Sequence, residues 1–267
     1  MSKVLVLPDI HGRLFWKDPC KDVGAYDKVI FLGDYLDPYR YGEEITEESA
    51  FENFKEILEL KKANPDKVVM LLGNHDMPYF SMEYLALNHS HSRYSRHHHE
   101  EFETLFDANR DLFTYAFTMD QVLFTHAGVI RDWYVDELGG SDDDSIDAVC
   151  ERVNNIGSDV KKFFKVSGYR GGWNHYSSCM WADVHEMMDQ EKKAEEEEHP
   201  APIVTMRQIF GHTLHASESY SGRVEILDPI LGKNFMMLDN CEAYVIDTEK
   251  FEITWASGNP QKVFRDY

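Results

Sequence analysis

Lys67-Val-Val-Met-Leu-Leu-Gly-Asn-His-Asp76 decides the fold, because an apolar run ends there in a glycine and three polar residues. Two earlier segments have the same form: Val4–Pro8 precedes Asp9-Ile-His11, and Val29–Gly33 precedes Asp34. Short apolar runs rich in β-branched residues are typical of buried strands. The sequence therefore predicts three strands, each of which ends in side chains that can bind a metal ion.

Helices are predicted between these strands. Residues 14–23 show a short helical pattern, and residues 43–63 place Phe51, Phe54 and Leu58 on one apolar helical face. Alternating strands and helices predict βαβ units and a largely parallel sheet, which makes the protein α/β. Because such sheets carry their sites at the carboxyl ends of the strands, the polar side chains are expected to meet at that edge.

The second half of the chain predicts further strands and two helical insertions. Paired strands are expected over residues 113–119 and 122–125, the second followed by His126, and a later strand over residues 203–210 is followed by His212. A β-meander is expected over residues 234–238, 243–247 and 251–255. Residues 77–112 and 139–200 have mostly helical spacing, so we expect a single domain over residues 1–267 with these segments inserted as a cap.

Composition limits the partners of this chain. With 267 residues, 43% of them hydrophobic, it can bury a sizeable core. Lys and Arg number 27 against 48 Asp and Glu, a net charge of -21 that makes nucleic acid and anionic membranes poor partners. The four cysteines are far apart, without a CxxC pair, and no apolar run is long enough to span a bilayer. A cytoplasmic location is therefore expected.

The polar residues at the predicted strand ends form a ligand set for two metal ions. Asp9 and His11 lie two apart, so in an extended segment they point the same way and can hold one ion together. Asp34 is placed to bridge two ions, and further ligands are Asn74, His126 and His212. Carboxylate, amide and imidazole ligands suit Mn²⁺, Fe, Zn²⁺ or Mg²⁺. Two such ions roughly 3.5–4 Å apart would clamp the attacking and leaving oxygens at phosphorus, with a bridging water as the nucleophile.

Five ordered motifs resemble those of the calcineurin-like metallophosphoesterases, and most closely those of the phosphoprotein phosphatases. They are Asp9-Ile-His-Gly12, Gly33-Asp-Tyr-Leu-Asp37, Gly73-Asn-His-Asp76, Thr125-His-Ala-Gly128 and Gly211-His-Thr213. Met180-Trp-Ala-Asp183 and Leu238-Asp-Asn-Cys241 are softer matches. The resemblance implies a four-layer α/β/β/α sandwich with two mixed sheets and an inserted helical cap.

The resemblance also implies a role for each matched residue. Asp9 and His11 would hold the first metal ion, Asp34 would bridge, and Asn74, His126 and His212 would hold the second. His75 would protonate the leaving group and Asp37 would orient it, since a carboxylate partner keeps an imidazole charged and directed. The expected metal is Mn²⁺, with Fe or Zn²⁺ as alternatives.

The chain departs from the family where phosphate is bound. The phosphatases have Arg-Gly after the second Asp, whereas this chain has Pro38-Tyr39-Arg40, and Asp76 stands where Glu is usual. Because only Arg offers a bidentate fork to phosphate oxygens, we consider Arg13, Arg40 and Arg170 as the phosphate clamp. Arg13 could instead be solvated at a helix start, and Arg170 could be a surface residue.

Several alternatives stay open at this point. Asp9, Asp34 and Asn74 could each be a helix N-cap, although their joint occurrence with four histidines favours the metal site. The cluster His89, His91, His97, His98 and His99 is either a solvated surface or a basic strip that faces the substrate.

The sequence predicts a phosphatase that acts on a phosphate monoester of a protein or a small molecule. The alternatives are a phosphodiesterase, a nucleotide or dinucleoside polyphosphate hydrolase, and a non-catalytic module that has kept the fold.

Overall fold

The computed structural model describes residues 2–38, 45–88, 94–157, 159–218, 223–256 and 264–266. Its first sheet contains the three strands that open the chain. β1 (Lys3–Leu7), β2 (Lys28–Phe31), β3 (Val68–Leu71) and β4 (Phe113–Thr114) run parallel in that order. β12 (Tyr244–Asp247) and β13 (Glu252–Trp255) extend the sheet beyond β1 as antiparallel strands. The predicted parallel core is thus confirmed within a mixed sheet.

The second sheet is also mixed, and it holds the strands that precede His126 and His212. Its order is β10 (Ile230–Leu231), β11 (Phe235–Met237), β7 (Arg207–Phe210), β6 (Val122–Thr125) and β5 (Ala116–Met119). β11, β7 and β6 are parallel, and both edge strands are antiparallel. A third, antiparallel sheet of β8 (Ala216–Glu218), β9 (Arg223–Ile226) and β14 (Phe264–Asp266) was not predicted.

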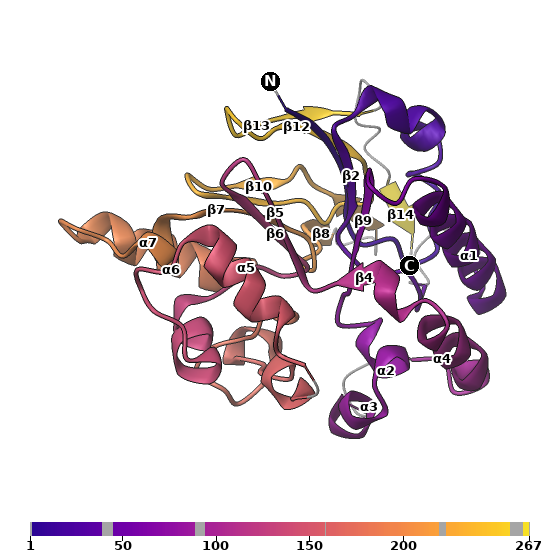
Figure 1. Ribbon diagram of the computed structural model, residues 1–267, viewed down its shortest axis with the longest axis horizontal. Helices are drawn as coiled ribbons and strands as arrows, with labels where there is room; N and C mark the ends of the chain where they lie inside the picture. The colour runs from indigo at the N-terminus through magenta and orange to yellow at the C-terminus, as the bar shows by residue number, and fades with distance from the viewer. Residues whose placement is uncertain are drawn as a thin grey trace.

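Alternating side chains on the strands explain the layers. Val4 and Val6 of β1 share a buried cluster with Val122 of β6, whereas Leu5 and Leu7 belong to the cluster on the opposite face of the sheet. Each such side chain, once fully buried, contributes about 1.5–3 kcal/mol. Figure 1 shows the two sheets next to each other, with α1 beyond the first and α5 beyond the second. The expected α/β/β/α sandwich is therefore confirmed.

Helices form the outer layers. η1 (Pro19–Ala25) is a short 3₁₀ segment, and α1 (Glu47–Ala63) begins at a capping box between Thr46 and Ser49. The first predicted insertion contains α2 (Met77–Phe80), α3 (Met82–Asn88), α4 (His99–Asp107) and η2 (Arg110–Leu112). α4 packs against α1 through stacked Phe51 and Phe102, whose ring centroids are 4.7 Å apart.

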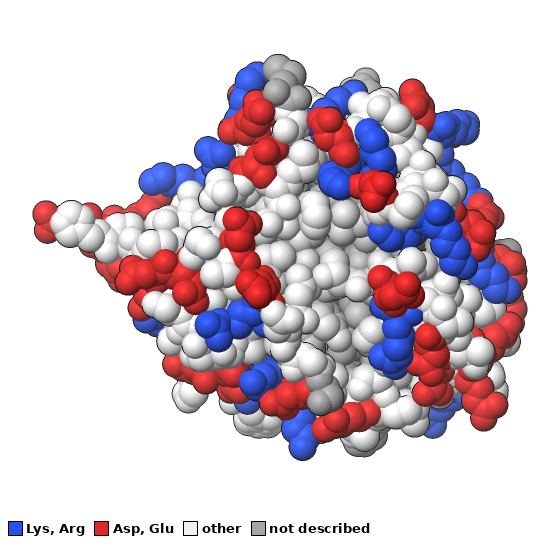
Figure 2. Space-filling view, viewed as in Figure 1, with Lys and Arg blue, Asp and Glu red and all other residues white. Residues whose placement is uncertain are grey.

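The second predicted insertion is helical with long connections. It contains α5 (Ile146–Asn154), η4 (Val160–Phe163), η5 (Gly168–Arg170) and α6 (Val184–Glu196), preceded by a π-helical turn η3 (Trp133–Glu137) and followed by α7 (Pro202–Thr205). Figure 1 shows α6 and α7 projecting at the left of the molecule. Figure 2 shows acidic side chains gathered on this projection, while the middle of the same face carries few charged residues.

Three predictions about the bounds or the pairing of strands were wrong. Residues 203–210 form α7 and then β7, because Pro202 at the first helical turn sets a helical φ. The C-terminal meander is divided between sheets, since β11 pairs with β7 and only β12 and β13 join the first sheet. Residues 113–119 form β4 in the first sheet and β5 in the second.

Asn154 of α5 explains how the chain passes from β4 to β5. Its Oδ1 accepts hydrogen bonds from the backbone N–H groups of Tyr115 and Ala116 at 2.9 and 3.0 Å and from the Thr114 hydroxyl at 2.6 Å. Its Nδ2 donates to the Ala116 carbonyl at 2.9 Å. One amide side chain thus satisfies backbone groups at the change of sheet.

We expect Asn154→Ala to lower the free energy of unfolding by about 2 kcal/mol, because it leaves partly buried backbone groups without hydrogen-bond partners. The exposed neighbour offers a matched control, and Asn155→Ala should change stability by no more than about 0.5 kcal/mol. Urea unfolding of both variants measures the difference. Equal losses would show that Asn154 has no special part in the crossing.

Candidate metal centre

The loops that follow the parallel strands are bound to one another, so the predicted ligands meet at one edge. The backbone N–H of His11 donates to the Asp34 carbonyl at 2.7 Å, and Gly211 N–H donates to the His126 carbonyl at 2.8 Å. His212 N–H lies 3.0 Å from both carboxylate oxygens of Asp9, which joins the first sheet to the second. All six predicted metal ligands lie in this region.

Two histidines are held in the tautomer that metal binding requires. The Nδ1 atoms of His11 and His126 lie 2.8 Å from the Leu36 carbonyl and 2.9 Å from the Leu32 carbonyl. A carbonyl can only accept, so each Nδ1 carries the proton and each Nε2 keeps a lone pair. Burial lowers the pKa of His11 to about 4. The ring of His11 is therefore neutral at neutral pH, as a ligand must be.

Electron-pair donors converge around His126. Its Nε2 lies 2.9 Å from Asn74 Oδ1 and 3.1 Å from His212 Nδ1. Burial lowers the pKa of His212 well below its usual range, so this ring is also neutral. Two ligand atoms that bind one metal ion at about 2.1 Å each lie about 3 Å from one another, as these atoms do. The donor set therefore fits a divalent metal ion.

Asp34 belongs to both of the residue groups that could bind a metal ion. One group is His11, Asp34 and His75, and the other is Asp34, His126 and His212. Asp34 Oδ1 accepts from the backbone N–H of His75 at 2.9 Å, and Oδ2 lies 3.4 Å from His11 Nε2 and 3.6 Å from His126 Nε2. Burial opposes the ionisation of Asp34, but the electrostatic interactions with His126 and His75 outweigh burial and lower the pKa of this carboxyl well below its usual range. This position suits a bridging carboxylate.

Asp9 lies against the loop that carries His212. Its carboxylate is buried and accepts from His212 N–H, and it belongs to neither three-residue group. Gly211 permits this approach, because a Cβ there would lie 2.0 Å from Asp9 Oδ2. Gly73 has the same relation to Asp34, with a Cβ position 2.1 Å from Oδ1. Both motif glycines are thus required by carboxylates that lie against the backbone.

Several site residues have left-handed backbones, which are unfavourable for side chains other than glycine. The φ angles of His11, Asp34, Asp37 and His212 are 44°, 55°, 56° and 69°. Such conformations persist where the surrounding structure over-determines them, and they concentrate at functional sites. These four residues lie in three loops, those after β1, β2 and β7, whose side chains gather at the site.

Asp76 is buried and connects two loops, a role that the sequence did not reveal. Its carboxylate accepts from the backbone N–H groups of Asp34, Gly73 and Tyr35 at 2.7, 2.8 and 2.9 Å. It therefore holds the loop after β2 against the loop after β3. The sequence showed that Asp76 replaces the usual Glu. It could not show the hydrogen bonds of Asp76, because the three backbone donors come from two different loops.

His75 and Asp37 form the expected pair. His75 Nδ1 lies 3.0 Å from Asp37 Oδ2, and the rings of His75 and His11 meet edge to face at 5.1 Å between centroids. Burial raises the pKa of Asp37, while hydrogen bonds from His75 and Tyr79 oppose the rise.

The three arginine candidates have different positions. Arg13 is buried beside the loop that carries His11, and Arg40 lies outside the described residues. Arg170 donates through Nη2 to the His212 carbonyl at 3.1 Å and to Thr213 Oγ1 at 2.7 Å, and its Nε lies 2.9 Å from Asp183 Oδ2. Arg170 is thus bound to the backbone of a predicted metal ligand and is not a simple surface residue.

Two softer motif matches also reach the site. The Trp181 ring packs edge to face on His212 at 5.7 Å between centroids. Asp239 is buried, and burial together with the charge of Asp9 raises its pKa well above the usual range, against the opposing charge of Arg13. The signal for Asp239 was its place directly after an apolar run, but the sequence did not assign it a role.

The histidine cluster contacts acidic side chains. His98 bridges Glu48 and Glu101 at 3.2 and 3.6 Å, and His99 lies 3.6 Å from Glu103. His97 is exposed, and His89 and His91 lie outside the described residues. The exposure of His97 agrees with the solvated-surface interpretation, whereas His98 and His99 are partly buried and also pack against Phe102 and Tyr79.

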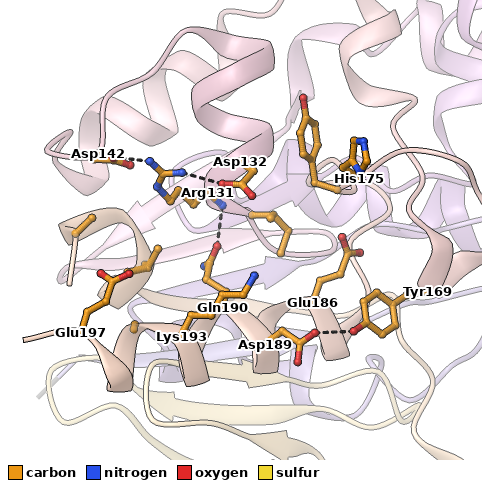
Figure 3. A pocket seen from close by; sticks show the side chains of 15 residues that line it. Arg131, Asp132, Asp142, Tyr169, His175, Glu186, Asp189, Gln190, Lys193 and Glu197 are labelled. Atoms are coloured by element: carbon orange, nitrogen blue, oxygen red, sulfur yellow. Dashed lines mark hydrogen bonds and ion pairs between the residues drawn. The ribbon is translucent and has the colours of Figure 1, made fainter.

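A separate cleft of about 570 Å³ lies beside α6 and contains none of the predicted site residues. Figure 3 shows two groups of interacting side chains along its wall. The Arg131 guanidinium contacts Asp132 and Asp142 at 2.8 and 2.6 Å, and the Tyr169 hydroxyl donates to Asp189 at 2.6 Å. The chemistry described above is therefore not located in this cleft.

A family comparison decides the class of protein. The model for calcineurin-like phosphoesterases matches residues 2–215, which include every predicted metal ligand. The chain belongs to the calcineurin-like phosphoesterase family. It is accordingly a phosphoric ester hydrolase, and the family implies divalent metal ions at this site.

Several solved structures are similar to this chain. A cold-active protein-tyrosine phosphatase of a psychrophilic Shewanella species is 14% identical with a TM-score of 0.53, covering 98% of this chain and 80% of its own. A Saccharomyces cerevisiae serine/threonine phosphatase similar to human PP5 is 12% identical, with a TM-score of 0.47 and coverages of 100% and 80%. A putative diadenosine tetraphosphatase is 16% identical, with a TM-score of 0.43 and coverages of 95% and 92%. No curated protein matches the sequence.

The described part of this phosphoesterase contains no helix both long and apolar enough to cross a membrane.

We expect Mn²⁺ to raise the melting temperature of the metal-stripped protein, because the ion binds the folded centre and not the unfolded chain. At 100 times the dissociation constant the gain is about 2.7 kcal/mol, or roughly 5–10 °C for a chain of this size. Asp34→Asn should remove most of the shift, while the exposed control Asp143→Asn should keep it. Differential scanning fluorimetry with and without Mn²⁺ measures both, and an undiminished shift in Asp34→Asn would contradict the bridging position.

Proposed function

We propose that this protein hydrolyses phosphate monoesters, of a phosphoprotein or of a small molecule, at a centre that holds two divalent metal ions, Mn²⁺ in the first place. The observation that carries the proposal is the shared position of Asp34 between two groups of donor atoms, next to the His75–Asp37 pair. A two-ion site and a proton donor are together what displacement at phosphorus requires.

Six residues are proposed as metal ligands. Asp34 would bridge, and the others would be Asp9 and His11 for one ion and Asn74, His126 and His212 for the second. When bound, two such ions acidify water and neutralise the charge on phosphoryl oxygens. The backbone bonds of Asp76 keep Asp34 and Asn74 in place during this reaction, since they join the two loops that carry them.

His75 is proposed as the general acid. Water that has lost one proton to the solvent attacks phosphorus, the bond to the leaving oxygen breaks, and the Nε2 proton of His75 passes to that oxygen. Asp37 holds Nδ1–H at 3.0 Å, so the ring stays oriented and its cationic form is stabilised. Solvent restores the proton in the next cycle.

Phosphate binding is assigned to arginine side chains near the centre. Arg13 is proposed to contact the phosphoryl group, and Arg40 stays a candidate from the sequence. Arg170 already uses Nε and Nη2 for Asp183, Thr213 and the His212 carbonyl. We propose that Arg170 holds the His212 loop, with only its other terminal nitrogen left for a phosphate oxygen. Substrate choice is assigned to the segments 77–112 and 139–200, and a cytoplasmic location is proposed.

The Mn²⁺-loaded protein should release phosphate from 4-nitrophenyl phosphate with a bell-shaped pH dependence of kcat. The rate falls at low pH because the attacking water must be deprotonated, and at high pH because His75 must be protonated. His75→Asn should lower kcat by about 10²–10⁴ and remove the alkaline decline, with little change in KM. A flat profile of the wild-type protein would exclude His75 as the acid.

The ester class is tested with the same assay. Asp34→Asn should abolish turnover, and Asp143→Asn should retain it. A protein that releases no phosphate at any pH would contradict the proposed function. Faster cleavage of bis(4-nitrophenyl) phosphate than of the monoester would favour a phosphodiesterase or polyphosphate hydrolase instead.

A further inference from the structure

A buried tyrosine completes the environment of the His75–Asp37 pair. Tyr79, in α2, donates its hydroxyl to Asp37 Oδ1, while Asp37 Oδ2 lies 3.0 Å from His75 Nδ1. Each carboxylate oxygen therefore has one defined donor. The Tyr79 side chain is 1% exposed and Asp37 is 4% exposed, so water does not compete freely for either oxygen.

The Tyr79 hydroxyl is itself held in place from the inserted segment. Ser95 N–H lies 2.6 Å from the hydroxyl oxygen. An oxygen that accepts from a backbone N–H has its own proton free for Asp37. Ser95 is buried, and its Oγ donates to Glu47 in the first turn of α1 and accepts from His98 N–H at 3.1 Å. The donor peptide is thus fastened to a helix of the main domain.

Packing alone does not account for this tyrosine. Its ring lies among aromatic side chains, with centroids 5.3 Å from Phe102 and 6.3 Å from Phe106. A phenylalanine would fill the same space without burying a hydroxyl, and a buried hydroxyl is unfavourable unless it is hydrogen-bonded. The hydroxyl is retained where it contacts the partner of the proposed acid.

We propose that Tyr79, held by the Ser95 peptide, is a positioning residue for the proton donor: it fixes the Asp37 carboxylate so that His75 keeps its ring direction. This inference rests on the proposed function. It gives residues 94–98 of the inserted segment a defined part in the reaction, because the acid is fully oriented only when Ser95 is in place. Loss of the Tyr79 hydroxyl frees one carboxylate oxygen and lets Asp37 and His75 turn.

The test compares two aryl monoesters with the Mn²⁺-loaded Tyr79→Phe protein. Phenyl phosphate needs its leaving oxygen protonated, whereas 4-nitrophenolate leaves more readily. We expect kcat to fall about tenfold or more on phenyl phosphate and about twofold on 4-nitrophenyl phosphate, with KM little changed. Tyr134→Phe is the matched control, because it also removes a buried tyrosine hydroxyl that donates to a carboxylate, that of Asp144 at 2.6 Å.

A double-mutant cycle shows whether Tyr79 acts through Asp37. On phenyl phosphate, Tyr79→Phe combined with Asp37→Asn should lose no more activity than Asp37→Asn alone. Equal loss on both esters, or additive losses in the cycle, would overturn the inference and leave the proposed function intact. A wild-type protein inactive on both esters would overturn the proposed function and this inference together. Manganese content and melting temperature confirm that each variant is folded and loaded.

Discussion

The mutual repulsion of electron-pair donors around Asp34 is the constraint on which the rest of the site depends. His126 Nε2 faces Asn74 Oδ1 and His212 Nδ1 at about 3 Å, and Asp34 Oδ2 lies between two imidazole nitrogens. Without a proton or a cation between them such atoms repel one another, so the folded protein must hold them together by other contacts and a bound ion then relieves the repulsion.

Those other contacts are mostly backbone hydrogen bonds in loops of restricted conformation. Asp76 joins the loops after β2 and β3, and Asp9 joins the loop after β1 to that after β7. Gly73 and Gly211 admit the carboxylates because no Cβ stands in their place. The cost of these unfavourable arrangements is offset by the burial of apolar side chains between the two sheets, most of them Val, Leu and Ile.

The helical segments are connected to this centre by polar contacts and not only by packing. Ser95 reaches Asp37 through Tyr79, and Asp183 at the start of α6 reaches the His212 carbonyl through Arg170. Both connections end on residues next to the ligand set. Substitutions in these segments would therefore also change the geometry around the ligand candidates.

The sequence by itself predicted the strands before the motifs and the candidate ligand residues, and its motifs identified the phosphoesterase family, because each of these depends on short stretches of neighbouring residues. Only the tertiary structure decided that residues 113–119 divide between two sheets, since an apolar run carries no information about which strand it pairs with. Likewise, only the structure showed what Asp76, Tyr79 and Arg170 contact, although the sequence had named Arg170 as a candidate for phosphate binding and Asp76 as part of a motif. Each acts through backbone or side-chain atoms of residues distant along the chain, and the spacing of residues cannot encode such contacts.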